Sequence, residues 1–371
     1  MKPRSFLEEA SLRQTCERPN SGMSGLALLR RVDANGELER QARYARFLGS
    51  PLVAGVLGAA RRQLWRGRQT AALVARWSGD PAQTALALRL NGALHALARQ
   101  GRHADLTALY QGQHDDFDRA VGDAIAADDQ FIAEWMQGPT QTNEVARTAA
   151  IHAALMVLAD RFAMPFELLE LGASCGLNLN LARYAYRLGS LRAGAVLSPV
   201  EIAPQWHGPE PAPASVEIAS ARGVDLNPLD PTDLATRERL LSYVWADQPQ
   251  RIARLEKALI LARTFAPQVD RGTASIWLAD QLARSQQSGQ CRVVLHSMVM
   301  QYLMEGDRAQ VHAAMRRAGS YANHERPLAC IGFEWTADRQ EVHLTLHSWP
   351  DGEQKCLAIC HPYGEWIEWI G

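Results

Sequence analysis

The chain has 371 residues, with 39 basic and 40 acidic side chains and a formal net charge of −1. Hydrophobic residues make up 47% and charged residues 21%, which is globular usage and excludes collagenous, coiled-coil and disordered classes. The near-zero charge argues against a strongly electrostatic nucleic-acid binder, because such proteins usually carry a basic excess. A chain of this length is expected to form two domains, or one large domain with an appended one.

The cysteine content and the hydropathy of the chain indicate in which cellular compartment the protein is expected. The six cysteines include no CxxC pair and do not form the framework of a short secreted protein, so we expect reduced thiols and a cytoplasmic location. Residues 1–14 are charged and lack the apolar core of a signal peptide. No stretch approaches about 18 uninterrupted apolar residues, so no membrane span is expected.

The first half of the chain has helical spacing and capping residues, with no convincing strand before residue 165. Ser50-Pro51 and Asp80-Pro81 each place a capping residue before a proline, which is typical of a helix start. Helices are predicted at residues 38–48, 51–65, 82–98, 106–110, 117–135 and 143–162. Residues 1–140 are therefore expected to form an all-α N-terminal cap domain.

The second half, residues 141–371, alternates short apolar runs with helical stretches, which indicates a mainly parallel sheet. Strands are predicted at residues 166–171, 216–221, 269, 292–296, 328–335, 341–348 and 354–361. Helices are predicted at residues 177–186, 231–245, 249–264, 274–284 and 308–318. Asp351-Gly352 indicates the turn of an antiparallel C-terminal hairpin. The expected fold class is a doubly wound α/β domain, with ligands at the carboxyl ends of its strands.

The most informative motif is the segment Glu170-Leu171-Gly172-Ala173-Ser174-Cys175-Gly176, between a predicted strand and a predicted helix. Small residues at 172, 174 and 176 let the backbone turn tightly and approach a ligand, and amides at the helix start can face it. The segment resembles the acid-x-Gly-x-Gly-x-Gly pattern of class I methyltransferases that use S-adenosylmethionine, with Ser174 in place of the middle glycine. That resemblance assigns Glu170 to the methionine amino group and the turn residues Gly172, Ser174 and Gly176 to the cofactor.

Other interpretations of this glycine turn stay open. A dinucleotide fingerprint fits less well, because Ser174 and Leu177 occupy its second and third glycine positions. The letters G-x-S-x-G also match the nucleophile elbow of a serine hydrolase, with Ser174 followed by Asp280 and by His347 or His361. However, the chain before the turn is helical and offers no oxyanion loop. A turn that serves packing alone is the third alternative.

Two residues later in the chain are further candidates. Asp225 follows a predicted strand and could hold ribose hydroxyls, although it lies well beyond the interval of about 20 residues typical of dinucleotide folds; the alternative is a turn or capping residue. His296 ends the strand at 292–296, where an ordinary pKa of about 6.5 would suit a general base. The alternative for His296 is a partly buried ring hydrogen-bonded to the backbone.

Candidate substrate contacts lie on both sides of the expected site. Asn143, Glu144 and Arg147 form a polar cluster at a helix start that could reach the site, or could cap that helix. Gln301 and Tyr302 follow His296 and are candidates to shape the site. Cysteines 356 and 360 share a strand face that residue 361 does not, and no further group has zinc spacing, so no metal site is expected.

Longer blocks resemble a bacterial family known only as a domain of unknown function. They are QTNEV (141–145), ELGASCGLNLNLARYAY (170–186), RGVDLNPLDPTD (222–233), YVWADQ (243–248), VVLHSMVMQYL (293–303) and HPYGEWIEWI (361–370). The resemblance implies a methyltransferase-like Rossmann fold more than a particular reaction. Together with the turn motif it leads us to expect a protein that binds S-adenosylmethionine and acts as a methyltransferase of unknown acceptor, with a small-molecule substrate. A non-catalytic binding module and a serine hydrolase using Ser174 are the alternatives. The sequence identifies neither the methyl acceptor nor the oligomeric state.

Overall fold

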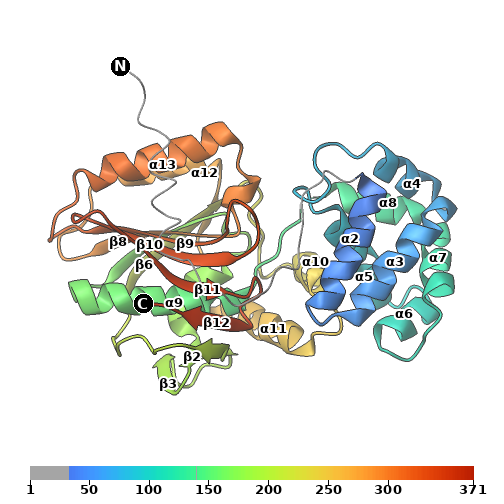
Figure 1. Cartoon of the computed structure of the whole chain (residues 1–371), viewed down its shortest axis with the longest axis horizontal. Coiled ribbons are helices and arrows are strands. Elements are labelled where there is room, and N and C mark those ends of the chain that lie inside the picture. The colour runs from blue at the N-terminus through green and yellow to red at the C-terminus, as the bar shows by residue number, and fades with distance from the viewer. Residues whose placement is uncertain (1–32, 139) are drawn as a thin grey trace. The chain divides into compact units, whose positions relative to one another are not determined.

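The computed structural model describes residues 33–138 and 140–371, which divide by their internal contacts into two units (Figure 1). The α/β unit comprises Glu144–Pro228 and Pro267–Gly371, and the helical unit comprises the described residues up to 143 together with Leu229–Ala266. The segment expected to be α/β, residues 141–371, includes Leu229–Ala266, because no pattern in one chain shows that a segment returns to an earlier unit.

The helical unit consists of short helices joined by tight turns. Its N-terminal helices are α2 (Ala34–Phe47), α3 (Pro51–Gln63), α4 (Arg68–Ala75), α5 (Leu86–Arg99), α6 (Ala104–Tyr110), α7 (Phe117–Ala127) and α8 (Asp129–Gln137), with α10 (Leu234–Tyr243) and α11 (Pro249–Thr264) added later. The helix predicted at 117–135 is two helices that meet at Asp128. Asp80-Pro81 forms a turn, so α5 begins only at Leu86.

Helix α5 is the centre of the helical unit. Its residues Leu90, Leu94 and Leu97 are fully buried. Gly92 lets α10 approach, because a Cβ at this position would lie 2.7 Å from Tyr243 Cε1. His95 Nδ1 lies 3.1 Å from the Ser242 carbonyl oxygen. These contacts explain why α10 belongs to this unit.

The α/β unit is built on a nine-stranded mixed sheet that is mostly parallel. Its strands are β1 (Phe166–Leu171), β5 (Gln205–His207), β6 (Ile218–Asp225), β7 (Val269–Arg271), β8 (Cys291–Ser297), β9 (Leu328–Trp335), β10 (Val342–Trp349), β11 (Glu353–Cys360) and β12 (Trp366–Trp369). The spatial order is β5-β12-β11-β10-β9-β8-β1-β6-β7. Pairing is antiparallel from β9 through β12 and parallel elsewhere. The expected antiparallel C-terminal hairpin is confirmed as β10–β11.

A small second sheet fills much of the segment between β1 and β6. Its strands are β2 (Ala185–Leu188), β3 (Leu191–Gly194) and β4 (Glu201–Ile202), in the order β3-β2-β4. The helix predicted at 177–186 is the 3-10 helix η3 (Leu177–Arg183), which ends where β2 begins. Backbone hydrogen bonds and a short sheet thus replace the crossover helix that a parallel β1–β6 pair usually has.

Helices cover both faces of the large sheet (Figure 1). Helices α12 (Ala274–Ala283) and α13 (Glu305–Gly319) lie on one face and α9 (Thr148–Phe162) lies on the other. The core under α12 and α13 includes Leu169, Leu171, Val224, Val294 and Leu328, which are all buried. We call this side the α12/α13 face and the other the α9 face.

The strand order creates a topological switch point between β1 and β8. From β1 the chain moves outward to β6 and β7 on one side, and then returns to add β8 and β9 on the other. All five of these strands are parallel. In open α/β sheets, ligands bind beyond the carboxyl ends of the strands at such a point.

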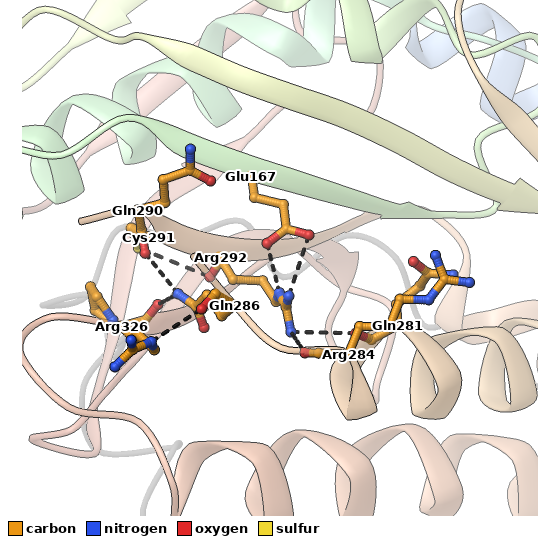
Figure 2. Close-up of polar contacts among 9 residues, drawn as sticks. Glu167, Gln281, Arg284, Gln286, Gln290, Cys291, Arg292 and Arg326 are labelled. Carbon is orange, nitrogen blue, oxygen red and sulfur yellow. Dashed lines mark hydrogen bonds and ion pairs between the residues drawn. The ribbon is translucent and has the colours of Figure 1, made fainter. Parts of the chain in front are cut away.

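At the opposite, amino ends of these strands a buried ion pair joins β1 to β8 (Figure 2). Arg292 Nε donates to Glu167 Oε2 at 2.8 Å, and Arg292 Nη1 donates to the carbonyl oxygens of Gln281 and Arg284 at 3.3 and 3.2 Å. The Arg292 side chain is 5% exposed and that of Glu167 is 23% exposed. The guanidinium therefore closes the C-terminal end of α12 and fixes β8 beside β1.

We expect Glu167→Gln to lower the free energy of unfolding by about 2–3 kcal/mol, because it leaves the buried Arg292 charge without its carboxylate. Urea denaturation measures this change. The exposed pair Arg326–Glu325, whose side chains are 43% and 74% exposed, supplies the control: Glu325→Gln should change the free energy by less than about 1 kcal/mol. Equal effects of the two substitutions would contradict a structural role for the buried pair.

Candidate functional site

The backbone is strained on both sides of the switch point. In the turn after β1, Gly172, Ser174 and Gly176 have φ values of +66°, +54° and +72°, and after β8 Met298 has φ +59°. Left-handed backbone is uncommon for residues other than glycine, and such strain often marks functional sites. Ser174 and Met298 are thus two non-glycine residues held in this conformation at the carboxyl ends of neighbouring strands.

The loops after β1 and β8 pack directly on each other. A Cβ placed on Gly172 would overlap Val299 Cγ2, and one placed on Gly176 would lie 2.5 Å from Pro267 Cβ. The sequence predicted that glycine would allow a close approach to the turn. In this structure the group that approaches Gly172 most closely is the side chain of Val299.

Three amides of the turn are bonded within the protein. Ala173 N donates to the Val224 carbonyl oxygen at 3.0 Å, Gly176 N to the Ala173 carbonyl oxygen at 2.7 Å, and Ser174 N to Asp225 Oδ2 at 2.8 Å. The turn therefore does not present the row of free amides that the sequence analysis expected, and its geometry does not favour a phosphate ligand. Asp225 Oδ1 also accepts from Asn227 N at 2.9 Å, so this carboxylate braces the turn from the end of β6.

Three residues in or beside the turn, Glu170, Ser174 and Asn178, each have a buried polar side-chain atom without a hydrogen-bond partner; we call them the acceptor cluster. Glu170 Oε1 accepts from Asn178 Nδ2 at 2.8 Å. Glu170 Oε2, Asn178 Oδ1 and Ser174 Oγ are buried and have no hydrogen-bond partner. Buried polar atoms are normally paired, and each unpaired one costs about 1–3 kcal/mol. When Glu170 is ionised, the cluster is therefore suited to a donor that the chain itself does not supply.

Without a cationic donor beside it, Glu170 is expected to be protonated rather than charged near neutral pH. Burial raises the pKa of Glu170 to about 8; the Asn178 amide opposes this rise, and the negative charge of Asp225 adds to it. Near neutral pH the carboxyl group is consequently mostly protonated. A cation at Oε2 would favour the ionised form and release the proton.

His296 is held in an ion pair. Its Nδ1 lies 2.8 Å from Glu334 Oε1. Burial lowers the pKa of His296, but the interactions with Cys330 and Glu334 outweigh burial and raise it from the ordinary 6.5 to about 10. The ring is therefore an imidazolium near neutral pH. The general-base role expected from an ordinary pKa requires that this pair be broken first.

Glu334 also holds the loop that follows β8. Its Oε1 accepts from Val299 N at 2.9 Å and from Met300 N at 3.3 Å. One carboxylate on β9 thereby fixes His296 and positions Val299, the residue that covers Gly172.

Strand alternation separates the two main candidates. In the β1–β8 register, Glu170 lies beside Leu295 and Leu171 lies beside His296. Neighbouring residues of a strand point to opposite faces of the sheet, so Glu170 lies on the α9 face and His296 on the α12/α13 face. The structure brings together Glu170, Ser174 and Asp225 around the turn, and it places His296 apart from them.

The candidate substrate residues have varied surroundings. Glu144 Oε1 accepts from Ala146 N at 3.2 Å, as a helix cap does, and Arg147 donates to the Pro362 carbonyl oxygen at 2.9 Å and to Ser297 Oγ at 3.4 Å. Asn143 is buried and groups with the helical unit. Of the two candidate residues that follow β8, one is hydrogen-bonded within its loop and the other is exposed. Gln301 Nε2 donates to the Met298 carbonyl oxygen at 3.4 Å, and Tyr302 is 59% exposed.

Two other chemistries find little support. Ser174 Oγ has no hydrogen-bond partner, so no histidine activates it as a hydrolase would require.

Among residues 33–138 and 140–371, no group of three His, Cys, Asp or Glu side chains could hold a metal ion. Within the same residues, no helix combines the length and apolar character needed to cross a membrane.

Sequence reasoning missed Asn178, Glu334 and Val299. Asn178 stands in the quoted block that follows the turn, but an asparagine in a predicted helix gives no sign that it faces Glu170. Glu334 is 38 residues from His296 in the chain. Parallel pairing of β8 with β9, which places His296 beside Gly332, was the only available signal for that contact.

The comparison with known families agrees with the blocks quoted above. A family model described as an uncharacterized protein conserved in bacteria (DUF2332) matches residues 35–369. The match covers most of the chain, so the chain belongs to this family. No curated protein matches the chain.

We expect Gly172→Ala to destabilise the protein by more than the cost of left-handed backbone alone, which is about 1–2 kcal/mol, because its Cβ meets Val299. Gly352→Ala is the matched control, since Gly352 has φ +68° and nothing within 4 Å of a Cβ. Adding Val299→Ala should recover the excess. Chemical denaturation of the three variants measures these differences, and equal losses at positions 172 and 352 would contradict the contact.

The His296–Glu334 pair predicts a pH dependence. Because the pKa of His296 is raised from 6.5 to about 10 in the folded state, the stabilisation is present below pH 6.5 and is lost as the pH rises toward 10. The difference in unfolding free energy between the wild type and Glu334→Gln should shrink over that range. NMR titration of the His296 ring gives the pKa directly, and an ordinary value in the wild type would refute the pair.

Proposed function

We propose that this member of the DUF2332 family binds S-adenosylmethionine and transfers its methyl group to a small-molecule acceptor. In this proposal the α/β unit is a methyltransferase-like Rossmann domain. The acceptor cluster carries the proposal, because it offers the chemistry that an amino-acid ammonium group needs.

The unpaired atoms of the cluster match an ammonium better than they match an anion. Asn178 Oδ1 can only accept a hydrogen bond, and Glu170 Oε2 can only accept one while Glu170 is ionised. The Ser174 hydroxyl can accept a hydrogen bond as well. An ammonium carries three donors and one positive charge. It would pair the orphaned atoms and replace the proton on Glu170.

Position supports the same proposal. The cluster lies at the turn after β1, beside a topological switch point, where open α/β sheets bind ligands. Asp225 ends the neighbouring strand β6. Each of its carboxylate oxygens has more than one acceptor position, so a ribose hydroxyl could bind Asp225 alongside the turn amides.

The residues of this chain would bind and align the reactants. The sulfonium of S-adenosylmethionine supplies an activated methyl group, so the protein's task is to hold the acceptor in line and exclude water. Glu170, Ser174 and Asn178 would hold the ammonium end, and Gly172 and Gly176 would keep the turn compact. His296 would contribute a positive charge from the other face while it remains paired with Glu334.

That pairing also favours a second candidate, a binding module without transfer activity. An acceptor that must lose a proton needs a base, and His296 near neutral pH already carries its proton. Retained affinity for S-adenosylmethionine with no methyl transfer to any compound in a cell extract would favour this second candidate.

Calorimetric titration with S-adenosylmethionine tests the proposal through its proton balance. Glu170, with a pKa of about 8, must release its proton as the ammonium binds. Below pH 8 we expect release of up to one proton per ligand, seen as a heat that depends on the ionisation enthalpy of the buffer. Affinity should therefore rise with pH toward about 8 and fall above it, because the α-amino group of the free ligand, with an ordinary pKa of about 7.7–8.0, then loses its proton.

Two controls separate the ammonium from the rest of the ligand. Methylthioadenosine, which lacks the amino-acid portion, should bind without proton release. Glu170→Gln should remove the release and weaken the binding of S-adenosylmethionine by at least about tenfold, or about 1.4 kcal/mol. No binding of either compound would sink the proposal, and binding without proton release would remove Glu170 from the site.

A further inference from the structure

Large apolar side chains are exposed on the segments that follow β6, β7 and β8, at the carboxyl ends of the parallel strands. Leu226 is 70% exposed, Ile276 63%, Tyr302 59% and Met304 76%. We call these four residues the apolar rim. A single exposed apolar side chain is ordinary on a protein surface, but several that adjoin one another mark a place where a ligand or a partner binds.

The part of the rim after β6 adjoins the proposed site. Leu226 follows Asp225, whose carboxylate accepts from Ser174 N at 2.8 Å in the turn after β1. Arg271 Nη1, at the end of β7, donates to the Leu226 carbonyl oxygen at 3.2 Å and to Asn227 Oδ1 at 3.4 Å. An exposed guanidinium with several further donors therefore lies beside the first residue of the rim.

The part of the rim after β7 and β8 is joined by a hydrogen bond between α12 and α13. Ser275 Oγ donates to Asp307 Oδ1 at 2.8 Å, which brings the first turns of the two helices together. Ile276 lies in the first turn of α12, and Met304 is the N-cap residue of α13. Tyr302 precedes Met304 in the loop after β8. The rim side chains therefore belong to one edge of the α/β unit rather than to separate surfaces.

The make-up of this edge favours a small amphiphilic molecule over a protein. Four apolar side chains are few for a stable protein interface, which takes about 20–30 residues a side. Small-molecule sites are mostly apolar, with a few polar groups that orient the ligand, and in open α/β sheets they lie at this edge. Here Arg271 supplies a polar group whose charge complements an anion.

The charge of His296 narrows the choice of nucleophile. Its ring is already an imidazolium near neutral pH, so it does not take a proton from an acceptor. A carboxylic acid has an ordinary pKa of about 4 and is ionised near neutral pH without help. A carboxylate acceptor consequently needs no general base.

We propose that the methyl acceptor is a carboxylate with an apolar tail, of the medium-chain fatty acid class, whose tail lies on the apolar rim and whose head pairs with Arg271. This inference rests on the proposed function, because it names the acceptor of that methyl transfer. A carboxylate oxygen forms a bond to the methyl carbon while the bond from that carbon to the sulfonium sulfur breaks. The electron pair of the broken bond stays on sulfur, so the products are a methyl ester and a neutral thioether, and no proton moves.

The binding part is tested on the full-length protein without S-adenosylmethionine. In calorimetric titrations, decanoate should bind at least about tenfold more tightly than butyrate, which has the same head and fewer methylene groups. Arg271→Gln should weaken the binding of decanoate by about threefold, as expected for an exposed ion pair. Equal affinities for decanoate and butyrate would overturn the proposal.

Two substitutions of similar exposure separate the rim from other apolar surface. Tyr302→Ser should weaken the binding of decanoate by at least about threefold, because it removes apolar area from the rim. Tyr321→Ser is the matched control, since Tyr321 is 77% exposed and lies beyond the other end of α13, and it should leave the affinity unchanged. Equal effects of the two substitutions would contradict a site on the rim. A dimer that Met304→Ser dissociates, detected by light scattering, would assign the rim to a second copy of the chain and would also overturn the proposal.

The transfer part uses S-adenosylmethionine with a labelled methyl group and decanoate as the acceptor. We expect labelled methyl decanoate, formed at least about tenfold more slowly from butyrate as its own ester and more slowly in Tyr302→Ser than in Tyr321→Ser. Binding of S-adenosylmethionine with no labelled ester at saturating decanoate would overturn the carboxylate acceptor and leave the proposed function standing. No binding of S-adenosylmethionine would sink the proposed function and this acceptor with it, so the two failures are distinguishable.

Discussion

The contact between Val299 and Gly172 is the constraint on which the carboxyl end of the parallel strands depends. It joins the loop after β8 to the turn after β1 at the point where the strand order reverses. Neither loop has relaxed backbone, since Ser174 and Met298 both have positive φ. Strained backbone persists only where its surroundings over-determine it. Here the determinants are the Asp225 carboxylate behind the turn and the Glu334 carboxylate behind the loop.

These two carboxylates hold backbone amides on opposite faces of the sheet. Asp225, at the end of β6, holds the amide of Ser174, and Glu334, on β9, holds the amides of Val299 and Met300 together with His296. The amides would otherwise be unpaired, so each carboxylate replaces water with a fixed acceptor. Glu334 thus contacts both His296 and the loop whose Val299 packs against Gly172.

The coarse fold could be predicted from the sequence, because strand and helix periods are local properties. FELLEL and RVVLH are apolar runs that could be identified as buried strands, and the Asp351-Gly352 turn located the C-terminal hairpin. The return of Leu229–Ala266 to the helical unit could not be predicted, because it depends on how Tyr243 fits against Gly92, a contact between segments far apart in the chain. The candidate site was predicted in part for the same reason. The turn motif is local, so Glu170 and Ser174 could be grouped from their positions along the chain, and Asp225 from its place at the end of a strand. The state of His296 was not accessible, since its pKa is set by Cys330 and Glu334 on the neighbouring strand.

The buried state of the acceptor cluster has a thermodynamic consequence. Glu170, Ser174 and Asn178 are 1%, 5% and 4% exposed, so under the proposed function an ammonium would reach Glu170 Oε2 only after the turn or the loop after β8 had moved. A ligand shifts such an equilibrium only by the difference between its affinities for the two states. Pairing three orphaned atoms and ionising Glu170 are interactions available only in the bound state. Under the proposed function, the buried turn therefore holds unsatisfied polar groups that a cationic ligand would satisfy.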